Sequence, residues 1–149
     1  MEDSAVQFEG DTESEVDANE RLFTLFGAVA AVTTVVAYGV VGYMLLESAV
    51  YGAIVGAFGG VGSYLFLPWF MGLSTVQEQS DEELGFADAS QRVSSSAQMG
   101  VLGLGLEAGS IVAIAVGLSV AEPDPGIGAG AAIAVTLVIY LVGSTLLDF

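Results

Sequence analysis

Residues 98–120 read QMGVLGLGLEAGSIVAIAVGLSV, and this stretch decides the fold because it has the length and composition of a membrane-spanning helix. At about 1.5 Å of rise per residue, Glu107 lies roughly 14 Å from Gln98, near the centre of a hydrocarbon layer about 30 Å thick. A carboxyl group at that depth is costly, and an ionisable side chain inside a span is a candidate functional site by default. Glu107 is therefore the leading candidate residue of this chain.

A second apolar stretch occupies residues 22–73 and is interrupted only by Glu47. It is about twice as long as one bilayer crossing requires, so it must contain two helices, and the polar pair Glu47-Ser48 marks the turn between them. After residue 120 the segment AEPDPG predicts a tight turn, in which Asp124 is placed to cap the next helix. The predicted spans are 22–46, 49–73, 98–120 and 126–147.

The predicted fold class is all-α: an integral membrane bundle of four transmembrane helices in one domain, residues 21–149. Residues 1–20 are small, polar and acidic, and they predict a disordered tail because they offer too little apolar area to bury. Residues 74–97 form the one sizeable loop. This loop is strongly acidic and is expected to lie in water.

Composition agrees with a membrane protein. The chain has 149 residues, of which 54% are hydrophobic, and its mean hydropathy of +0.73 is too high for a soluble domain. Against 18 acidic residues stand only Arg21 and Arg92, which gives a net charge of −16. A surface this acidic repels nucleic acid, so the expected partner is the lipid bilayer and not a nucleic acid.

The chain contains neither cysteine nor histidine. It therefore cannot form disulfides or use a thiolate, and it lacks the commonest metal ligand and the commonest general base. We expect no enzyme activity, no cofactor and no metal site built from these residue types.

The acidic loop QEQSDEELGFADAS, the absence of Lys and Cys, and the Ala, Val and Gly-rich spans resemble the small multi-pass membrane proteins of haloarchaea. The resemblance covers the composition of the whole chain. It implies a salt-rich cytoplasm, where a Debye length of about 3 Å screens the self-repulsion of the acidic surface. It implies no particular activity.

Small residues recur at intervals of four in three of the predicted spans. Because such residues leave bare backbone on one face of a helix, they allow a second helix to approach closely. They are Gly52, Gly56 and Gly60; Gly105 and Gly109; and Gly126, Gly130 and Ala134. We expect packing seams at these positions, and a homo-oligomer or a larger membrane protein as the assembled state. Since Gly105 and Gly109 flank Glu107, the face of Glu107 is predicted to be a packed seam.

No Lys, Arg or His lies within a predicted span, so an ionised Glu107 has no counter-charge from its own chain inside the membrane. Glu107 is either a neutral acid that is hydrogen-bonded, or it faces water, a bound cation or a basic residue of another subunit. Polar side chains at similar depth are its possible hydrogen-bond partners. They are Ser110, Thr33, Thr34, Thr136 and Tyr140.

The two arginines predict the orientation in the cell membrane. Arg21 immediately precedes the first span and Arg92 precedes the third, and basic residues that flank spans are retained in the cytoplasm. Both termini are therefore expected to be cytoplasmic. Trp69 lies near the end of the second span, where an indole prefers the headgroup boundary, and we interpret it as a further topology anchor.

Residues 17–22 (DANERL) and 88–93 (DASQRV) match in register ahead of the first and third spans. The match suggests a duplicated helical hairpin, whose two copies would be parallel repeats. Convergence explains it equally, because Asp, Glu or Gln and Arg are favoured at any such helix start.

Two classes of function follow from these features. The favoured one is a structural or accessory membrane subunit that packs through its glycine seams. The alternative is a small ion- or proton-coupled transporter or channel, in which Glu107 exchanges a proton or a cation.

Single cysteines introduced at Ser14, Ser48 and Ser80 test the topology, because the natural chain contains no cysteine. In intact cells an impermeant thiol reagent should label only the Ser48 variant, since the Glu47-Ser48 turn is expected outside. Labelling at Ser14 or Ser80, with protection at Ser48, would show the opposite orientation.

Overall fold

The computed structural model describes residues 3–78, 85–93 and 97–147, and every regular element within these ranges is a helix. In chain order the elements are α1 (Asp3–Leu46), α2 (Ala49–Glu78), α3 (Phe86–Arg92), α4 (Ala97–Ser119) and α5 (Pro125–Leu147). Four candidate spans, Arg21–Leu46 within α1 and the whole of α2, α4 and α5, are long and apolar enough to cross a bilayer. The chain is a multi-pass, all-α membrane protein, and the predicted fold class is confirmed.

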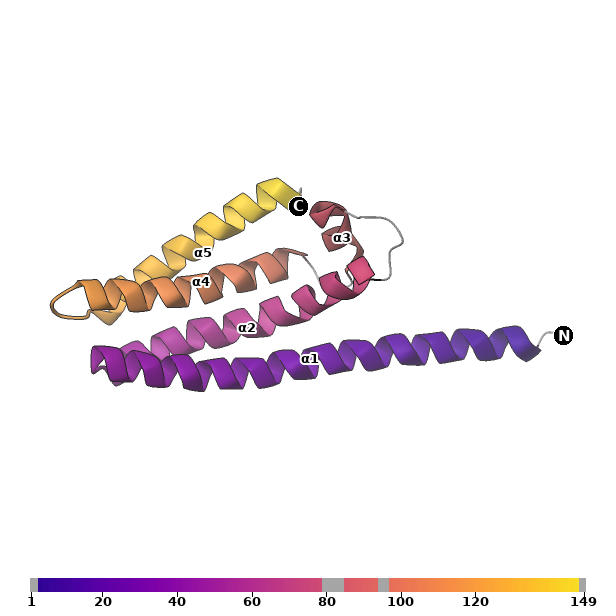
Figure 1. Ribbon diagram of the computed structural model, residues 1–149, viewed down its shortest axis with the longest axis horizontal. Coiled ribbons are helices and arrows are strands. Elements are labelled where there is room, and N and C mark those ends of the chain that lie inside the picture. The colour runs from indigo at the N-terminus through magenta and orange to yellow at the C-terminus, as the bar shows by residue number, and fades with distance from the viewer. Residues whose placement is uncertain (1–2, 79–84, 94–96, 148–149) are drawn as a thin grey trace.

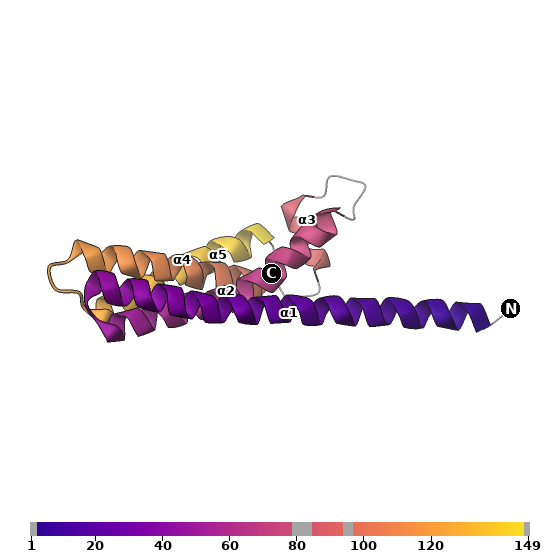
Figure 2. The ribbon, with the colours of Figure 1, turned by 60° about the horizontal axis from the view of Figure 1, so that its bottom comes forward.

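The four spans lie in an open row in the order α1, α2, α4, α5 (Figure 1). In the most apolar 18 residues of each span, 44% of the stretch in α2 and 39% of that in α4 is buried inside the protein. The buried share is only 11% in α1 and 17% in α5. The two middle helices therefore form the protein interior, and the two outer helices present large faces to lipid. Both hairpin turns lie at one end of the row, opposite the two chain termini (Figures 1 and 2).

Each hairpin turn has a local cause. Glu47 adopts a left-handed conformation with φ of 50°, which ends α1, and the Ser48 Oγ accepts a hydrogen bond of 3.2 Å from the Tyr51 amide at the start of α2. Asp124 caps α5 as the sequence predicts. Its Oδ1 accepts hydrogen bonds from the amides of Gly126 at 2.7 Å and Ile127 at 3.2 Å.

The seam of Gly52, Gly56 and Gly60 packs against α1. A Cβ atom added to Gly56 would lie 2.6 Å from the Val35 carbonyl oxygen and 3.2 Å from the Gly39 amide nitrogen, so backbone meets backbone there. One turn on either side, Gly52 and Gly60 face the same helix. The partner of this seam, which the sequence left open, is the helix that precedes it in the chain.

The other two groups of small residues belong to the second hairpin, which α4 and α5 form: one lies between its two helices and the other on its outer surface. Gly105 and Gly109 of α4 face α5, where a Cβ added to Gly109 would lie 2.6 Å from the Ala132 carbonyl oxygen. Gly126, Gly130 and Ala134 are exposed, and a Cβ on Gly130 would meet nothing within 4 Å. This third face of small residues therefore points away from the protein.

Two segments differ from the sequence-based predictions. Residues 3–20, predicted as a disordered tail, continue α1 as helix, and Figure 1 shows α1 extending well beyond the other spans. Once a span has formed, adding residues to its end avoids the cost of helix nucleation, and acidic residues are favourable near a helix N-terminus. The predicted loop 74–97 is shorter, because α2 continues to Glu78 and α3 occupies part of the remainder.

The two matching segments have different surroundings. Residues 17–22 lie inside the continuous helix α1, whereas residues 88–93 lie mostly within α3, which ends at Arg92 before α4 begins at Ala97. The two hairpins nevertheless run in the same direction, because both turns lie at one end (Figure 1). Duplication of a hairpin stays a hypothesis.

Replacing Gly56 by Leu should destabilise the protein by about 1–3 kcal/mol, because the new side chain must push α1 and α2 apart. Val29→Leu is the matched control, since Val29 is 58% exposed on α1. Unfolding of both variants in mixed detergent micelles, followed by loss of helical circular dichroism, measures the difference. Equal stability of the two variants would mean that the α1–α2 seam is not a close contact.

Candidate functional site

Three polar residues meet halfway along three different spans. Thr34 lies 13 residues after Arg21 and 12 before Leu46 in the α1 span, and Ser63 lies 14 residues from the start of α2 and 15 from its end. Glu107 lies 10 residues after the first residue of α4 and 12 before the last. The cluster of Thr34, Ser63 and Glu107 is therefore placed near the membrane midplane, and we call it the midplane cluster.

Hydrogen bonds join the members of the midplane cluster. The Ser63 hydroxyl donates to Oε2 of Glu107 over 3.1 Å, and the hydroxyl oxygens of Ser63 and Thr34 are 2.9 Å apart. When Glu107 is ionised, Ser63 gives its single hydroxyl proton to the carboxylate and therefore accepts the proton of Thr34. Ser63 is only 2% exposed, whereas Glu107 as a whole residue is half-buried, so Ser63 is the more deeply buried of the two.

Glycines bring α2 and α4 close enough for this contact. A Cβ added to Gly62 would lie 2.7 Å from the Glu107 amide nitrogen and 2.8 Å from the Gly103 carbonyl oxygen. On the other helix, a Cβ added to Gly103 would lie 2.6 Å from the Phe66 amide nitrogen. The backbones of α2 and α4 therefore touch beside the carboxyl group, and this contact sets the distance that Glu107 must span to reach Ser63.

Helix α1 joins the cluster through a third glycine. A Cβ added to Gly59, one turn before Ser63, would lie 3.0 Å from the Thr34 methyl group and would overlap the ring of Tyr38. The missing side chain at Gly59 lets Thr34 and Tyr38 lie against α2. Tyr38 also interacts electrostatically with Glu107, so it is a further titratable group beside the cluster.

The predicted partners of Glu107 have different positions. Thr34 is linked to Glu107 through Ser63, while the Ser110 hydroxyl donates to the backbone carbonyl of Glu107 at 2.6 Å. The Thr33 hydroxyl is exposed and donates to Val29, and Thr136 donates to the carbonyls of Gly105 and Ala132. Tyr140 lies half-buried on α5. The direct partner, Ser63, was absent from the sequence-based candidates.

The face of α4 that carries Glu107 is packed against another helix, but Gly105 and Gly109 are not the glycines that form this contact. Gly105 and Gly109 were expected to place Glu107 in their own packing seam, but they pack on α5 whereas Glu107 faces α2. Residues two apart on a helix are about 200° apart around its axis, so these glycines belong to the opposite face. The small residue on the same face as Glu107 is Gly103, four positions earlier.

Two aromatic side chains of α2 fasten the hairpins together on either side of the midplane cluster. Tyr51 is 1% exposed, and its hydroxyl donates to the Ala113 carbonyl at 2.7 Å; its ring lies where Gly117 and Gly128 have no side chains. Trp69, predicted as an interfacial anchor, is 3% exposed and packs on Gly100. The indole therefore holds α2 to α4, and its place is inside the protein.

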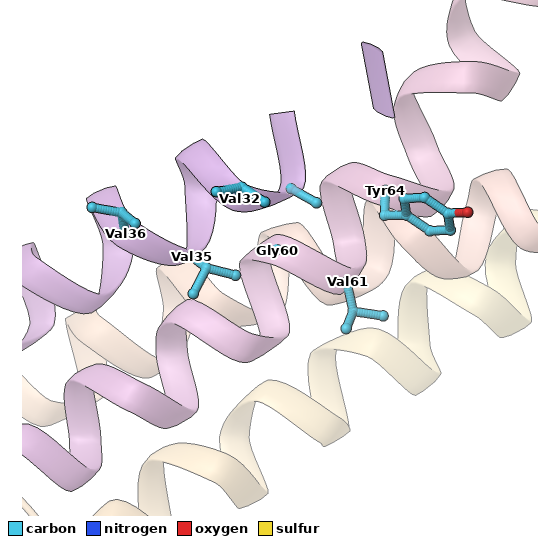
Figure 3. Close-up of a pocket in the computed structure, with 7 residues that line it drawn as sticks. Val32, Val35, Val36, Gly60, Val61 and Tyr64 are labelled. Atoms are coloured by element: carbon cyan, nitrogen blue, oxygen red, sulfur yellow. The ribbon is translucent and has the colours of Figure 1, made fainter. Parts of the chain in front are cut away.

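An apolar groove of about 360 Å³ lies between α1 and α2 (Figure 3). No polar atom faces it, and the midplane cluster lines none of it. Its lining consists of Ala31, Val32, Val35, Val36, Gly60, Val61 and Tyr64. The groove therefore offers a ligand no hydrogen bond and no charge.

The two arginines are exposed and lie outside the midplane cluster. Arg21 begins the α1 span, and Arg92 is the last residue of α3. Arg21 stands at the first position of its span and Arg92 belongs to α3, so neither lies at the depth of Glu107.

Comparisons of the chain with protein-family models, with curated proteins and with solved structures found no match in any of the three. Function is therefore argued from the midplane cluster and from the outer faces of the row.

Proposed function

We propose that this chain is a structural or accessory subunit of a membrane assembly, and that it packs through α5 against a second copy or a larger membrane protein. The observation that supports this proposal is the outward face of Gly126, Gly130 and Ala134. Small residues at intervals of four favour close helix contacts in lipid, and the seams at Gly56 and Gly109 are both occupied by helices of the same chain. Of the three groups of small residues, the one on α5 therefore remains available for contact with another protein.

The open row supports the same proposal. α1 and α5 stand at its two ends, and each is mostly exposed along its apolar window. A lateral neighbour on α5 would cover this surface and turn an outer helix into an inner one. The role is not enzymatic, and the protein contributes packing surface.

The proposed setting is the cell membrane of a halophile, with both termini in the cytoplasm. The support for high salt is the balance of 18 acidic against two basic residues, which requires strong screening. The support for the orientation is that Arg21 begins the α1 span, whose other end is the hairpin turn, and that Arg92 ends α3 before the α4 span begins.

A second candidate function is ion- or proton-coupled transport through Glu107. The position of Glu107 near the middle of its span supports this candidate, because ionisable side chains inside membrane spans often mark ion or proton pathways. One carboxyl oxygen of Glu107 accepts a hydrogen bond from Ser63, in a cluster to which three helices contribute side chains. The two candidates differ in whether Glu107 must carry a charge.

Gly130→Leu should separate assembly from folding. The variant should fold, because a Cβ atom at Gly130 meets no heavy atom of the chain within 4 Å, but it should keep a neighbouring helix at a distance. Purification from native membranes in molar salt, with light scattering and mass spectrometry, should show a partner or a second copy with the natural protein and its loss with Gly130→Leu. Gly130→Ala, which keeps a small side chain, is the matched control and should assemble. Assembly that is unaffected by Gly130→Leu would refute a contact through this face.

Glu107→Gln tests the second candidate. Gln keeps the size and hydrogen-bonding capacity of the side chain but cannot ionise, so we expect expression and assembly close to those of the natural protein. Proton and sodium flux in proteoliposomes is the second measurement. An active natural protein beside an inserted but inactive Gln variant would favour transport over the subunit role.

A further inference from the structure

Hydroxyl groups in the spans mostly donate to a backbone carbonyl three or four residues earlier in the same helix. This holds for Thr33, Ser74, Thr75, Ser110, Ser119, Thr136, Ser144 and Thr145. Such bonding is the local solution for a hydroxyl that has no water nearby. Thr34 and Ser63 differ, because their hydroxyls are directed to one another and to Glu107. Three oxygen atoms from three helices are thereby brought together.

The charge of these groups is unbalanced whenever Glu107 is ionised. The chain has no Lys or His, Arg21 is the first residue of its span, and Arg92 lies in α3, so neither arginine is at the depth of Glu107. Tyr38, a further titratable group beside the cluster, is an acid and supplies no positive charge. An isolated carboxylate in a low-dielectric interior is strongly unfavourable, so one positive charge must come from outside the chain.

We propose that Glu107, Ser63 and Thr34 form a site for one exchangeable monovalent cation, either a proton or a sodium ion. Carboxylate and hydroxyl oxygens are hard ligands, which suit hydrogen-bonded protons and hard metal ions. A single carboxylate neutralises a single charge, whereas a divalent ion would leave net positive charge in the membrane interior. Membrane proteins place ion sites near the bilayer midplane between packed helices, and this cluster has that position.

Occupancy of the site would reorganise the hydrogen bonds of the cluster. In the ionised state Ser63 donates to Glu107 and accepts from Thr34. A proton on Glu107 reverses the order, since Glu107 then donates to Ser63 and Ser63 donates to Thr34. A sodium ion would instead take the oxygens of Glu107 and the two hydroxyls as ligands. Binding requires no transport, so the site is independent of the proposed subunit function.

Labelling by dicyclohexylcarbodiimide tests the proposal, because this apolar reagent reacts with protonated carboxyl groups. The purified full-length protein is labelled in detergent from about pH 5 to pH 9, with choline chloride keeping the ionic strength constant, and modification of Glu107 is measured by mass spectrometry. A proton site predicts labelling that decreases as pH rises and ignores sodium. A sodium site predicts that replacing choline by sodium protects Glu107 at constant pH. Labelling that is independent of both pH and sodium, or that is absent throughout, would refute the site.

Adjacent threonines provide a matched pair of variants. Thr34→Val and Ser63→Ala each remove one ligand, and both should change the cation concentration at half-labelling by about tenfold. Thr33→Val removes a hydroxyl that is exposed and bonded within its own helix, so it should leave this concentration unchanged. Glu107→Gln provides the blank for labelling, and helical circular dichroism verifies folding of every variant. Identical behaviour of Thr33→Val and Thr34→Val would show that the cluster does not hold the cation.

Discussion

The close contact between α2 and α4 at Gly62 and Gly103 is the interaction on which the rest of the structure depends. Lipid tails are as apolar as Leu side chains, so two helices in a bilayer gain nothing from hydrophobic burial against each other. Their association requires van der Waals contact and hydrogen bonds, and both are strongest where the backbones touch. Gly62 lies against the backbone of Glu107, so the same contact that joins the hairpins also places the carboxyl group beside Ser63.

Aromatic contacts extend this joint along α2 in both directions. Tyr51 occupies the space left by glycines of α4 and α5, and Trp69 occupies the space above Gly100. In each of these two contacts a large aromatic ring fills the space beside a glycine, which has no side chain. The helices can therefore pack densely there. The two hairpins are therefore joined at three positions along α2, namely Tyr51, Gly62 and Trp69. By contrast, α1 packs mainly on α2, and α5 packs mainly on α4.

Much of the fold could be predicted from the sequence because its signals are local. Span length, the Glu47-Ser48 turn and the Asp124 cap depend only on neighbouring residues, and the four candidate spans follow from them. Partners across helices depend on rotation about each helix axis, which composition does not determine. Ser63 was missed because a lone serine in a span usually bonds its own helix, and Trp69 because its distance from the end of the span suggested the interface. Counting residues from each span end would have placed Ser63 level with Glu107, and that signal was present in the sequence.

The midplane cluster and the seam that joins α4 to α5 are on different sides of α4, and this separation has a physical consequence. Glu107 faces α2, whereas the Gly105 and Gly109 seam with α5 lies on the opposite face of the same helix. A change in the charge of Glu107 alters hydrogen bonds among α1, α2 and α4 but leaves the α4–α5 seam in contact. The outer face of α5 is one helix further away, so a neighbour bound there would sense Glu107 only if α4 itself moved or rotated. Because α4 is held by Tyr51 on one side of the cluster and by Trp69 on the other, such movement is opposed at two points, and cation binding and lateral assembly are expected to be weakly coupled.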